Sequence, residues 1–370
     1  MKKIFTCGAL ILLFLAIGSM AKAKEPYKLN VIYFLPQGDQ PVEGYESRLN
    51  DLLLYVQDFY RHEMKRNGFG NKTFGLEKTS DKRVKILVIR GKYDIPYYSY
   101  DNGGGWKAER EIEAYFKANP GTKKSHHALV IMPSTSGDDM NPGGVPFYGI
   151  GKYCFALDYK YFDIKYLGED SEKGRLLTKW FGGMAHELGH GLNLPHNKEQ
   201  VSAGKEHGTA LMGSGNYTFG QKPTFLTKAS CAILNNCEVF AQKEMEYYNK
   251  NTGFQLKEME VDFPGTSLPA DEIVVKGVFE TKIPVNAVNV YVDHAPFGQV
   301  NNDYDAESWT VKPDKNNHFA LRIPCKELHT KHIDSFQVRV RFLFENGIIT
   351  TQTADFKWND LVPYRFNKIK

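Results

Sequence analysis

Residues 186–196 read HELGHGLNLPH, which places three imidazoles and one carboxylate at the spacing of a catalytic metal site. His186 and His190 are four residues apart, so on a helix both rings lie on the same face and can bind one ion. Three neutral imidazoles hold Zn²⁺ at about 2.0 to 2.1 Å and leave its fourth position to water, as in catalytic zinc sites. The pattern therefore predicts one catalytic zinc ion with His186, His190 and His196 as its ligands.

Glu187 directly follows the first of these histidines. A zinc ion lowers the pKa of a bound water toward about 7, and a neighbouring carboxylate can accept the released proton and pass it to a leaving amine. We therefore expect Glu187 to be the general base of a hydrolytic reaction.

The third histidine requires a bend in the chain. On a continuous helix His196, six residues after His190, would point about 120° away from the pair. Gly191 and Asn193 tolerate positive φ angles, and Pro195 cannot continue a helix. The sequence thus predicts that the helix ends here and that the chain turns to bring His196 to the ion.

Together these residues resemble the extended motif of the metzincin metallopeptidases, HExxHxxGxxH followed by a methionine-containing turn. Residues 208–214 read GTALMGS, and the resemblance implies that Met212 forms an apolar floor beneath the ligands. The adamalysin or reprolysin branch is the most similar. Its next helix begins near a Ser-Cys pair, here within residues 227–232.

Two positions depart from that branch. Asn193 replaces a glycine, which asparagine tolerates at positive φ, and Asn197 replaces an aspartate, so any supporting contact from it is weaker or made differently. The additional tyrosine ligand of the astacin and serralysin branches is absent, because Ser214 occupies that position. Tyr217 lies at another offset and is a candidate substrate contact.

The sequence also contains candidate residues for other metal-ligand sets. In the gluzincin plan the third ligand is a glutamate from a later helix, for which Glu238 and Glu244 are available. A structural calcium site at Asp138 and Asp139 is a further alternative, although adjacent acids are more often simply solvated. Three histidines lack ligand spacing and are expected to be packed or at the surface: His126, His127 and His207.

The first 23 residues have a basic start, an apolar run from Ile4 to Ile17 and a small-residue end, which is typical of a secretory signal peptide. The run is shorter than the about 20 residues of a membrane span, and no later segment is apolar enough for one. We expect an exported protein that is secreted, periplasmic or associated with the cell surface. The MKK start and a first strand soon after the signal suggest a bacterial protein without a long prodomain.

The formal net charge is +4, and loss of Lys2, Lys3 and Lys22 with the signal lowers it to +1. A charge this weak excludes strong steering toward nucleic acid or an anionic membrane. The expected partner is a protein or peptide substrate, glycoproteins included. The sequence does not set the oligomeric state.

Four cysteines lie outside the signal peptide. In an oxidising compartment they form up to two disulfides, for example Cys231 with Cys237, or Cys154 with either of these. Free buried thiols are equally compatible with the sequence. The four are Cys154, Cys231, Cys237 and Cys325.

Residues 24–261 have the pattern of an α/β domain, in which strands alternating with helices predict a twisted, mostly parallel sheet with helices on its faces. Residues 146–159 have an aromatic strand pattern before the active-site helix expected at 172–190. In metzincins an edge strand at this place pairs with the extended substrate, although an ordinary strand with bulges at its glycines is the alternative. The candidate substrate contacts are Phe147, Tyr148, Gly149, Ile150 and Gly151. The other strands are expected at 29–35, 84–90 and 127–133, with helices at 45–66 and 109–119.

Residues 262–271 have the Pro, Gly and Ser content of a linker, and beyond it the hydrophobic period changes to two. Residues 336–344 read FQVRVRFLF, and Asn346-Gly347 marks a tight hairpin. We expect residues 272–370 to form an immunoglobulin-like β-sandwich of six or seven strands. Its basic and aromatic outer face is interpreted as an ordinary surface, with glycan or cell-surface binding as the alternative.

These patterns predict an exported zinc-dependent metalloendopeptidase of metzincin type. One alternative is an exported adhesion or glycan-binding protein with a vestigial zinc site, and another is a zinc amidase acting on cell-wall peptide. The complete ligand set and Glu187 favour a working enzyme, because a degenerate one is expected to lose its base first.

Overall fold

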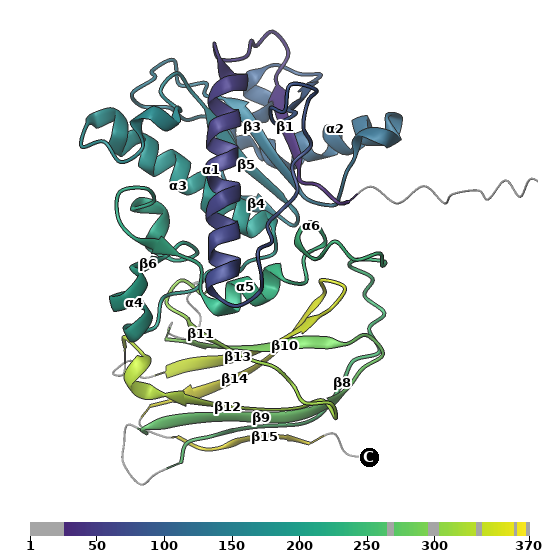
Figure 1. The fold of residues 1–370 in the computed structure, drawn as a ribbon, viewed down its shortest axis with the longest axis vertical. Helices are drawn as coiled ribbons and strands as arrows, with labels where there is room; N and C mark the ends of the chain where they lie inside the picture. Colours follow the sequence, from purple (N-terminus) through teal and green to yellow (C-terminus); the bar gives the residue numbers. More distant parts are fainter. Residues whose placement is uncertain (1–25, 265–269, 295–302, 331–334, 359–360, 368–370) are drawn as a thin grey trace, which may run out of the picture.

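The structure, a computed structural model, describes residues 26–264, 270–294, 303–330, 335–358 and 361–367. The predicted signal peptide, residues 1–23, and part of the predicted linker at 262–271 lie outside these residues. Figure 1 shows two parts stacked along the long axis, a mixed α/β part above and antiparallel sheets below.

The upper part is built on a five-stranded sheet in the order β2-β1-β3-β5-β4. The first four strands of this order are parallel neighbours, whereas β4 pairs antiparallel with β5 at one edge. All residues of β1, β3 and β5 are buried, as in parallel strands covered on both faces. The predicted mostly parallel sheet is confirmed. The bounds are β1 Asn30–Leu35, β2 Leu87–Arg90, β3 Ala128–Pro133, β4 Gly149–Ile150 and β5 Tyr153–Asp158.

Three long helices pack on this sheet. α1 buries an apolar stripe at helical spacing and runs along the front of the sheet in Figure 1. α3 begins at Ser171, whose hydroxyl accepts a hydrogen bond from the Gly174 amide at 3.0 Å. The Tyr60 hydroxyl of α1 donates to the Ala185 carbonyl of α3 at 3.0 Å and fixes the two helices together. The bounds are α1 Tyr45–Arg66, α2 Gly104–Ala118 and α3 Glu172–Gly191.

Short elements connect α3 to the lower part. α5 begins at Thr227, whose hydroxyl accepts a hydrogen bond from the Ser230 amide at 3.2 Å. A helix therefore starts near the Ser-Cys pair, as expected. The remaining bounds here are α4 Val201–His207, α5 Lys228–Leu234, α6 Glu238–Ala241, β6 Thr209–Ala210, β7 Thr224–Phe225, and the 3-10 helices η1 Ile95–Tyr98, η2 Tyr100–Asn102, η3 Pro120–Thr122, η4 Ile164–Tyr166 and η5 Ser214–Tyr217.

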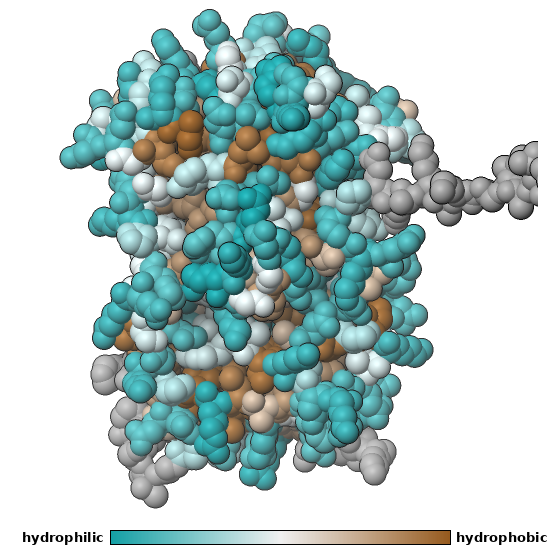
Figure 2. Space-filling model, in the orientation of Figure 1, coloured by the Kyte–Doolittle hydropathy of each residue, from teal (hydrophilic) through white to brown (hydrophobic). Residues whose placement is uncertain are grey.

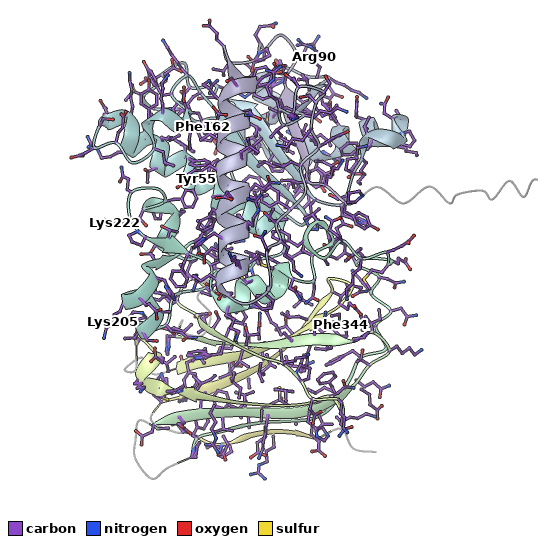
Figure 3. The ribbon with its side chains drawn as sticks, viewed as in Figure 1. Tyr55, Arg90, Phe162, Lys205, Lys222 and Phe344 are labelled. Carbon is purple, nitrogen blue, oxygen red and sulfur yellow. The ribbon has the colours of Figure 1, made fainter. Side chains whose placement is uncertain are left out.

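The lower part consists of two four-stranded antiparallel sheets in the orders β11-β10-β13-β14 and β12-β9-β8-β15. Apolar residues from both sheets form one core, which includes Phe344 at the end of β13, labelled in Figure 3. β8 precedes the predicted linker yet pairs with β9, so it joins this sheet. The bounds are β8 Gln255–Asp262, β9 Glu272–Glu280, β10 Val285–Asp293, β11 Glu307–Val311, β12 His318–Pro324, β13 Ser335–Phe344, β14 Ile349–Lys357, β15 Tyr364–Asn367 and η6 Cys325–Glu327.

The two parts are in direct contact through β10. Its residues Val288, Val290 and Val292 enter the sandwich core. On the opposite face the Asn289 side chain donates to the Ala229 carbonyl of α5 at 2.9 Å. Because both faces of β10 are covered, the sandwich is attached to the α/β part along a packed interface.

The four cysteines among the described residues are buried and free, so the structure agrees with the free-thiol alternative. Within the described ranges, no helix has the length and apolar character needed to cross a bilayer. The face in Figure 2 is mostly hydrophilic, with apolar areas beside α1 and over the sandwich.

Candidate active site

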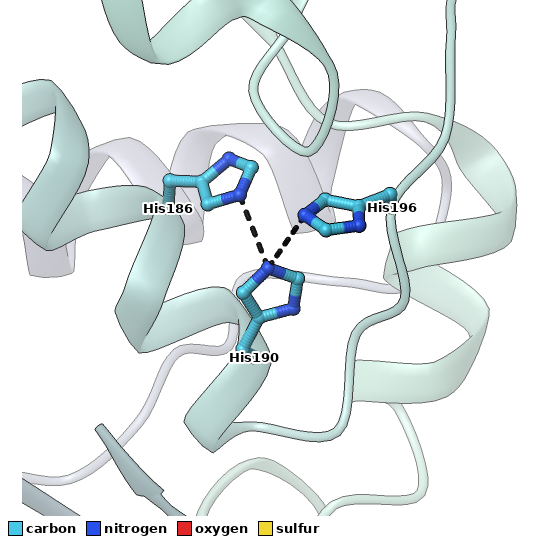
Figure 4. A group of neighbouring side chains, drawn as sticks. All are labelled: His186, His190 and His196. Atoms are coloured by element: carbon cyan, nitrogen blue, oxygen red, sulfur yellow. Dashed lines mark hydrogen bonds between the residues drawn. The ribbon is translucent and has the colours of Figure 1, made fainter. Parts of the chain in front are cut away.

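Three imidazoles converge at the end of α3, as shown in Figure 4. His186 and His190 come from the last turns of the helix, and His196 comes from the segment after it. The His190 Nε2 atom lies 3.1 Å from the His186 Nε2 and 2.9 Å from the His196 Nε2. The structure therefore brings together the three histidines that the sequence singled out.

Hydrogen bonds on the far side of the rings set their tautomers. The His186 Nδ1 faces the Leu211 carbonyl at 2.7 Å, and the His190 Nδ1 faces the Leu194 carbonyl at 2.8 Å. A carbonyl only accepts, so each Nδ1 carries the proton and each neutral ring presents an Nε2 lone pair to the centre. Lone pairs that face one another repel unless a cation lies between them, so this donor set could bind a metal ion. A tetrahedral zinc ion sets its nitrogen ligands about 3.3 Å apart, close to the spacing found.

Burial sets the charges of the site. Burial, followed by the neighbouring His190, lowers the pKa of His186 to about 3. Burial also lowers the pKa of His190 and raises that of Glu187 to about 8, against the opposing hydrogen bond from the Gly149 backbone. His186 and His190 are thus neutral and could bind a metal ion, and the Glu187 carboxyl can exchange a proton near neutral pH.

The bend after α3 follows the sequence expectation. Asn193 has a φ of 72°, and the Leu194 amide donates back to the Gly189 carbonyl at 2.9 Å. The Asn197 amide donates to the Met212 carbonyl at 3.1 Å, and its side chain donates to the Ser230 hydroxyl at 2.8 Å. Asn197 therefore supports the segment through α5, a contact of a different kind from that of an acidic residue.

Met212 lies directly against α3 between the two helical histidines. The residue is 1% exposed. A Cβ added to Gly189 would lie 2.4 Å from the Met212 sulfur, so a larger residue at this position would displace the Met212 side chain. The thioether therefore packs against the turn of α3 that carries Gly189, and the role of Met212 as a floor beneath the ligands stays a prediction.

The histidines open into a cleft of about 590 Å³. One side is β4, the edge strand, and Gly149 lies so close to His190 that a Cβ would come within 2.7 Å of the His190 Cβ. The opposite part includes Asp303 and Tyr304, which the sequence reasoning did not identify. The lining residues are Tyr148, Gly149, Gly151, Glu187, His190, Pro195, His196, Asp303 and Tyr304.

Three other candidate substrate contacts lie outside this lining. The Phe147 ring packs edge-on against Trp180 with centroids 5.0 Å apart, and Ile150 is 6% exposed, so both have structural partners. Tyr217 is at the end of η5 and is 68% exposed.

The alternative ligands lie elsewhere. Glu238 is buried and bonded to His126, with a distance of 2.9 Å between its carboxylate and the His126 Nδ1, and Glu244 is exposed. Asp138 and Asp139 accept hydrogen bonds from backbone amides. Among the described residues, the three histidines of the motif form the only group of three or more donors close enough to share an ion.

Comparison with known proteins shows which family the chain belongs to. No family model and no curated protein matches it. A crystal structure of catalytically inactive OgpA from Akkermansia muciniphila, in complex with an O-glycopeptide (glycodrosocin) substrate, is 45% identical in sequence, with 96% of this chain and 100% of that chain covered and a TM-score of 0.88. The chain belongs to the OgpA family. A wild-type OgpA structure is 47% identical, with 93% and 97% covered and a TM-score of 0.87.

The match to OgpA extends over both the α/β part and the sandwich, because nearly all of each chain is covered. Together with the three-histidine cluster, this kinship supports a metalloprotease.

Proposed function

We propose that the chain is an exported, zinc-dependent endopeptidase of metzincin type that cleaves O-glycosylated polypeptides. The observation that carries this proposal is the convergence of three imidazole Nε2 atoms beside Glu187, in a cleft bordered by an edge strand. The family adds the substrate class, since OgpA was crystallised with an O-glycopeptide substrate.

His186, His190 and His196 would hold the zinc ion, with Met212 beneath them. When bound, zinc supplies a Lewis acid that polarises the peptide carbonyl and makes water more acidic. Glu187 takes a proton from the attacking water and delivers it to the leaving amine. A pKa raised by burial suits both directions of this transfer. The carbonyl partners of the two Nδ1 atoms hold the rings in the orientation that zinc requires.

The peptide would bind along β4. This strand pairs with β5 on one side only. Its other side therefore presents backbone groups with which an extended peptide can form hydrogen bonds as an added strand. The absence of a side chain at Gly149 lets β4 pack directly against His190, which sets the edge strand beside the histidines. Gly149 and Gly151 are thus the substrate contacts favoured by their position in the cleft.

The glycan would contact the aromatic wall that continues from β4. The rings of Tyr148 and Tyr100 meet edge-on at 5.6 Å, and Tyr100 is 55% exposed. Trp106, near the start of α2, is 59% exposed and follows Gly105, where an added Cβ would lie 2.7 Å from the Tyr148 hydroxyl. Exposed aromatic faces beside hydroxyl groups suit sugar rings, which have both apolar C–H faces and polar edges.

The proposal also includes an export signal and a fold for the lower part. Residues 1–23 serve as the export signal, and the lower part is interpreted as an immunoglobulin-like sandwich that packs on the catalytic domain. A complete ligand set with an intact Glu187 favours catalysis over a vestigial site or a binding module.

The test uses glycodrosocin and the same peptide without its glycan. The zinc-loaded protein is incubated with each, and products are identified by mass spectrometry, with Glu187→Gln as the matched control. We expect cleavage of the glycosylated peptide only, and none by Glu187→Gln. Cleavage of neither peptide by a protein that carries one zinc ion per chain would contradict the proposal.

A further inference from the structure

Part of the cleft wall comes from the C-terminal sandwich. Tyr304 lines the cleft together with Glu187 and His196. Its ring stacks on the His196 imidazole, with centroids 3.6 Å apart and planes inclined by 22°. The residue is nevertheless 48% exposed, so one face of the ring covers His196 while the remainder faces the cleft.

Asp303 fixes the backbone immediately before Tyr304. Its φ of 67° lies in the left-handed region, which aspartate tolerates better than most residues. Its carboxylate is 5% exposed and forms ion pairs with Arg339 and with Arg341, the latter at 2.5 Å. Arg339 also binds Asp293 at 2.8 Å. A buried ionic network on β10 and β13 therefore anchors the residue that precedes Tyr304.

A backbone connection sets the distance between Tyr304 and the histidine motif. The Lys198 amide donates to the Ala306 carbonyl at 2.8 Å, and Lys198 forms a parallel bridge with Glu307. Lys198 is two residues after His196, and Ala306 is two residues after Tyr304. The two segments run side by side, so the stack of Tyr304 on His196 is tied to the main chain of both parts.

Tyr304 and Glu187 line the same cleft, so the phenol and the expected base border the same space. A phenol is a hydrogen-bond donor. During peptide hydrolysis negative charge develops on the carbonyl oxygen, and a donor held in place beforehand stabilises it without reorganisation.

We propose that Tyr304 is a further catalytic residue of this site: its ring holds His196 in position, and its hydroxyl donates a hydrogen bond to the carbonyl oxygen of the bond being cleaved. This inference rests on the proposed peptidase function. It assigns the sandwich a direct part in catalysis, because removing the sandwich would remove Tyr304 from the cleft.

The two roles separate in two variants of the full chain. Tyr304→Phe keeps the ring and loses the hydroxyl, so we expect kcat on glycodrosocin to fall by about 10² to 10³, while KM and zinc content stay unchanged. Tyr304→Ala also loses the stack, so the affinity for zinc, measured by chelator competition, should fall by about 10-fold or more. Tyr55→Phe removes a hydroxyl from the exposed face of α1 and is the control.

Several results would overturn the proposal. A kcat of Tyr304→Phe equal to that of the wild type would rule out the role of the hydroxyl. An unchanged zinc affinity of Tyr304→Ala would rule out the role of the stacked ring. A rise in activity on either substitution would show that Tyr304 obstructs the cleft. The zinc affinity separates this proposal from the proposed function, because it is measured without substrate. If the wild type cleaves nothing, the peptidase fails, whereas a zinc affinity of Tyr304→Ala equal to that of the wild type rules out the stacking role on its own.

The anchor provides a second test. Asp303→Asn keeps a residue that tolerates positive φ but removes the charge that pairs with Arg341. We expect this substitution to lower kcat/KM in the wild type and to change it by less than about twofold in Tyr304→Ala, because coupled residues do not act additively. Equal losses in both backgrounds would show that Asp303 acts independently of Tyr304.

Discussion

The fold treats two groups of histidines in opposite ways. The Nε2 atoms of His186, His190 and His196 face one another in a cleft. His127 is fully buried, and its two ring nitrogens face the Gly191 carbonyl at 2.6 Å and the Tyr248 hydroxyl at 2.5 Å.

The surroundings of the ring nitrogens distinguish a candidate metal ligand from a structural histidine. A histidine whose nitrogens both have protein partners has no lone pair left for an ion, whereas one whose second nitrogen faces other ring nitrogens could bind a cation. The two groups are also connected, because Gly191 ends the helix that carries His186 and His190. His127 is therefore expected to support the helix end, and the motif histidines to bind zinc.

The largest difference should appear in metal content. His190→Ala removes the central donor, so we expect zinc per chain, measured by mass spectrometry of the metal, to fall from one to near zero and peptidase activity to fall by at least about 10³-fold. Chelation of the wild type should have the same effect, reversed by zinc. His126→Ala, next to His127 in the sequence and outside the motif, should retain zinc and activity. Zinc lost from His126→Ala and kept by His190→Ala would reverse the comparison.

The buried group should control stability. His127→Ala leaves the Gly191 carbonyl and the Tyr248 hydroxyl without their partner in the core, so we expect the free energy of unfolding in urea to fall by about 3 kcal/mol. Zinc should stay bound in the folded protein. A variant as stable as the wild type would show that these bonds contribute nothing net.

The contact beneath the motif can be tested by a single methyl group. Gly189→Ala places a carbon 2.4 Å from the Met212 sulfur, so we expect a loss of about 2 kcal/mol in stability, together with weaker zinc binding. Gly121→Ala is the control, because no atom lies within 4 Å of its added carbon. Equal stability of the two variants would mean that Met212 moves aside freely.

The smallest effect is a pH dependence. Burial lowers the pKa of His127 to about 4, below the ordinary value of 6.5. The unfolded chain therefore takes up a proton first as pH falls, and stability is lost between pH 6.5 and 4. From pH 7 to 5.5 we expect a loss of about 1 kcal/mol in urea unfolding, which should be absent in His127→Ala. An identical loss in that variant would assign it to other groups.

Sequence patterns predicted most of the architecture that positions the site. The helices at 45–66 and 172–190 and the hairpin at Asn346 and Gly347 are confirmed, because local periodicity and turn chemistry specify them. The sandwich has eight strands among the described residues instead of six or seven. β8, β11 and β15 were missed, since short or mixed-polarity strands carry little periodic signal.

Within the site, the sequence identified what one segment supplies. The histidine cluster and Glu187 come from adjacent positions on a helix and its bend, so spacing alone brings them together. Tyr304 could not be found in this way, because its contact with His196 depends on packing between parts distant in sequence. The alternation of Arg339 and Arg341 in FQVRVRFLF was a usable signal, although it was interpreted as an ordinary outer face.

The most direct measurement of the central claim is a map of new peptide N-termini after zinc-loaded protein is incubated with a mixture of O-glycoproteins, with Glu187→Gln as the control. We expect new termini clustered at O-glycosylated residues, all dependent on Glu187 and abolished by chelation. New termini that persist in Glu187→Gln, or none at all from a protein carrying one zinc ion per chain, would contradict it.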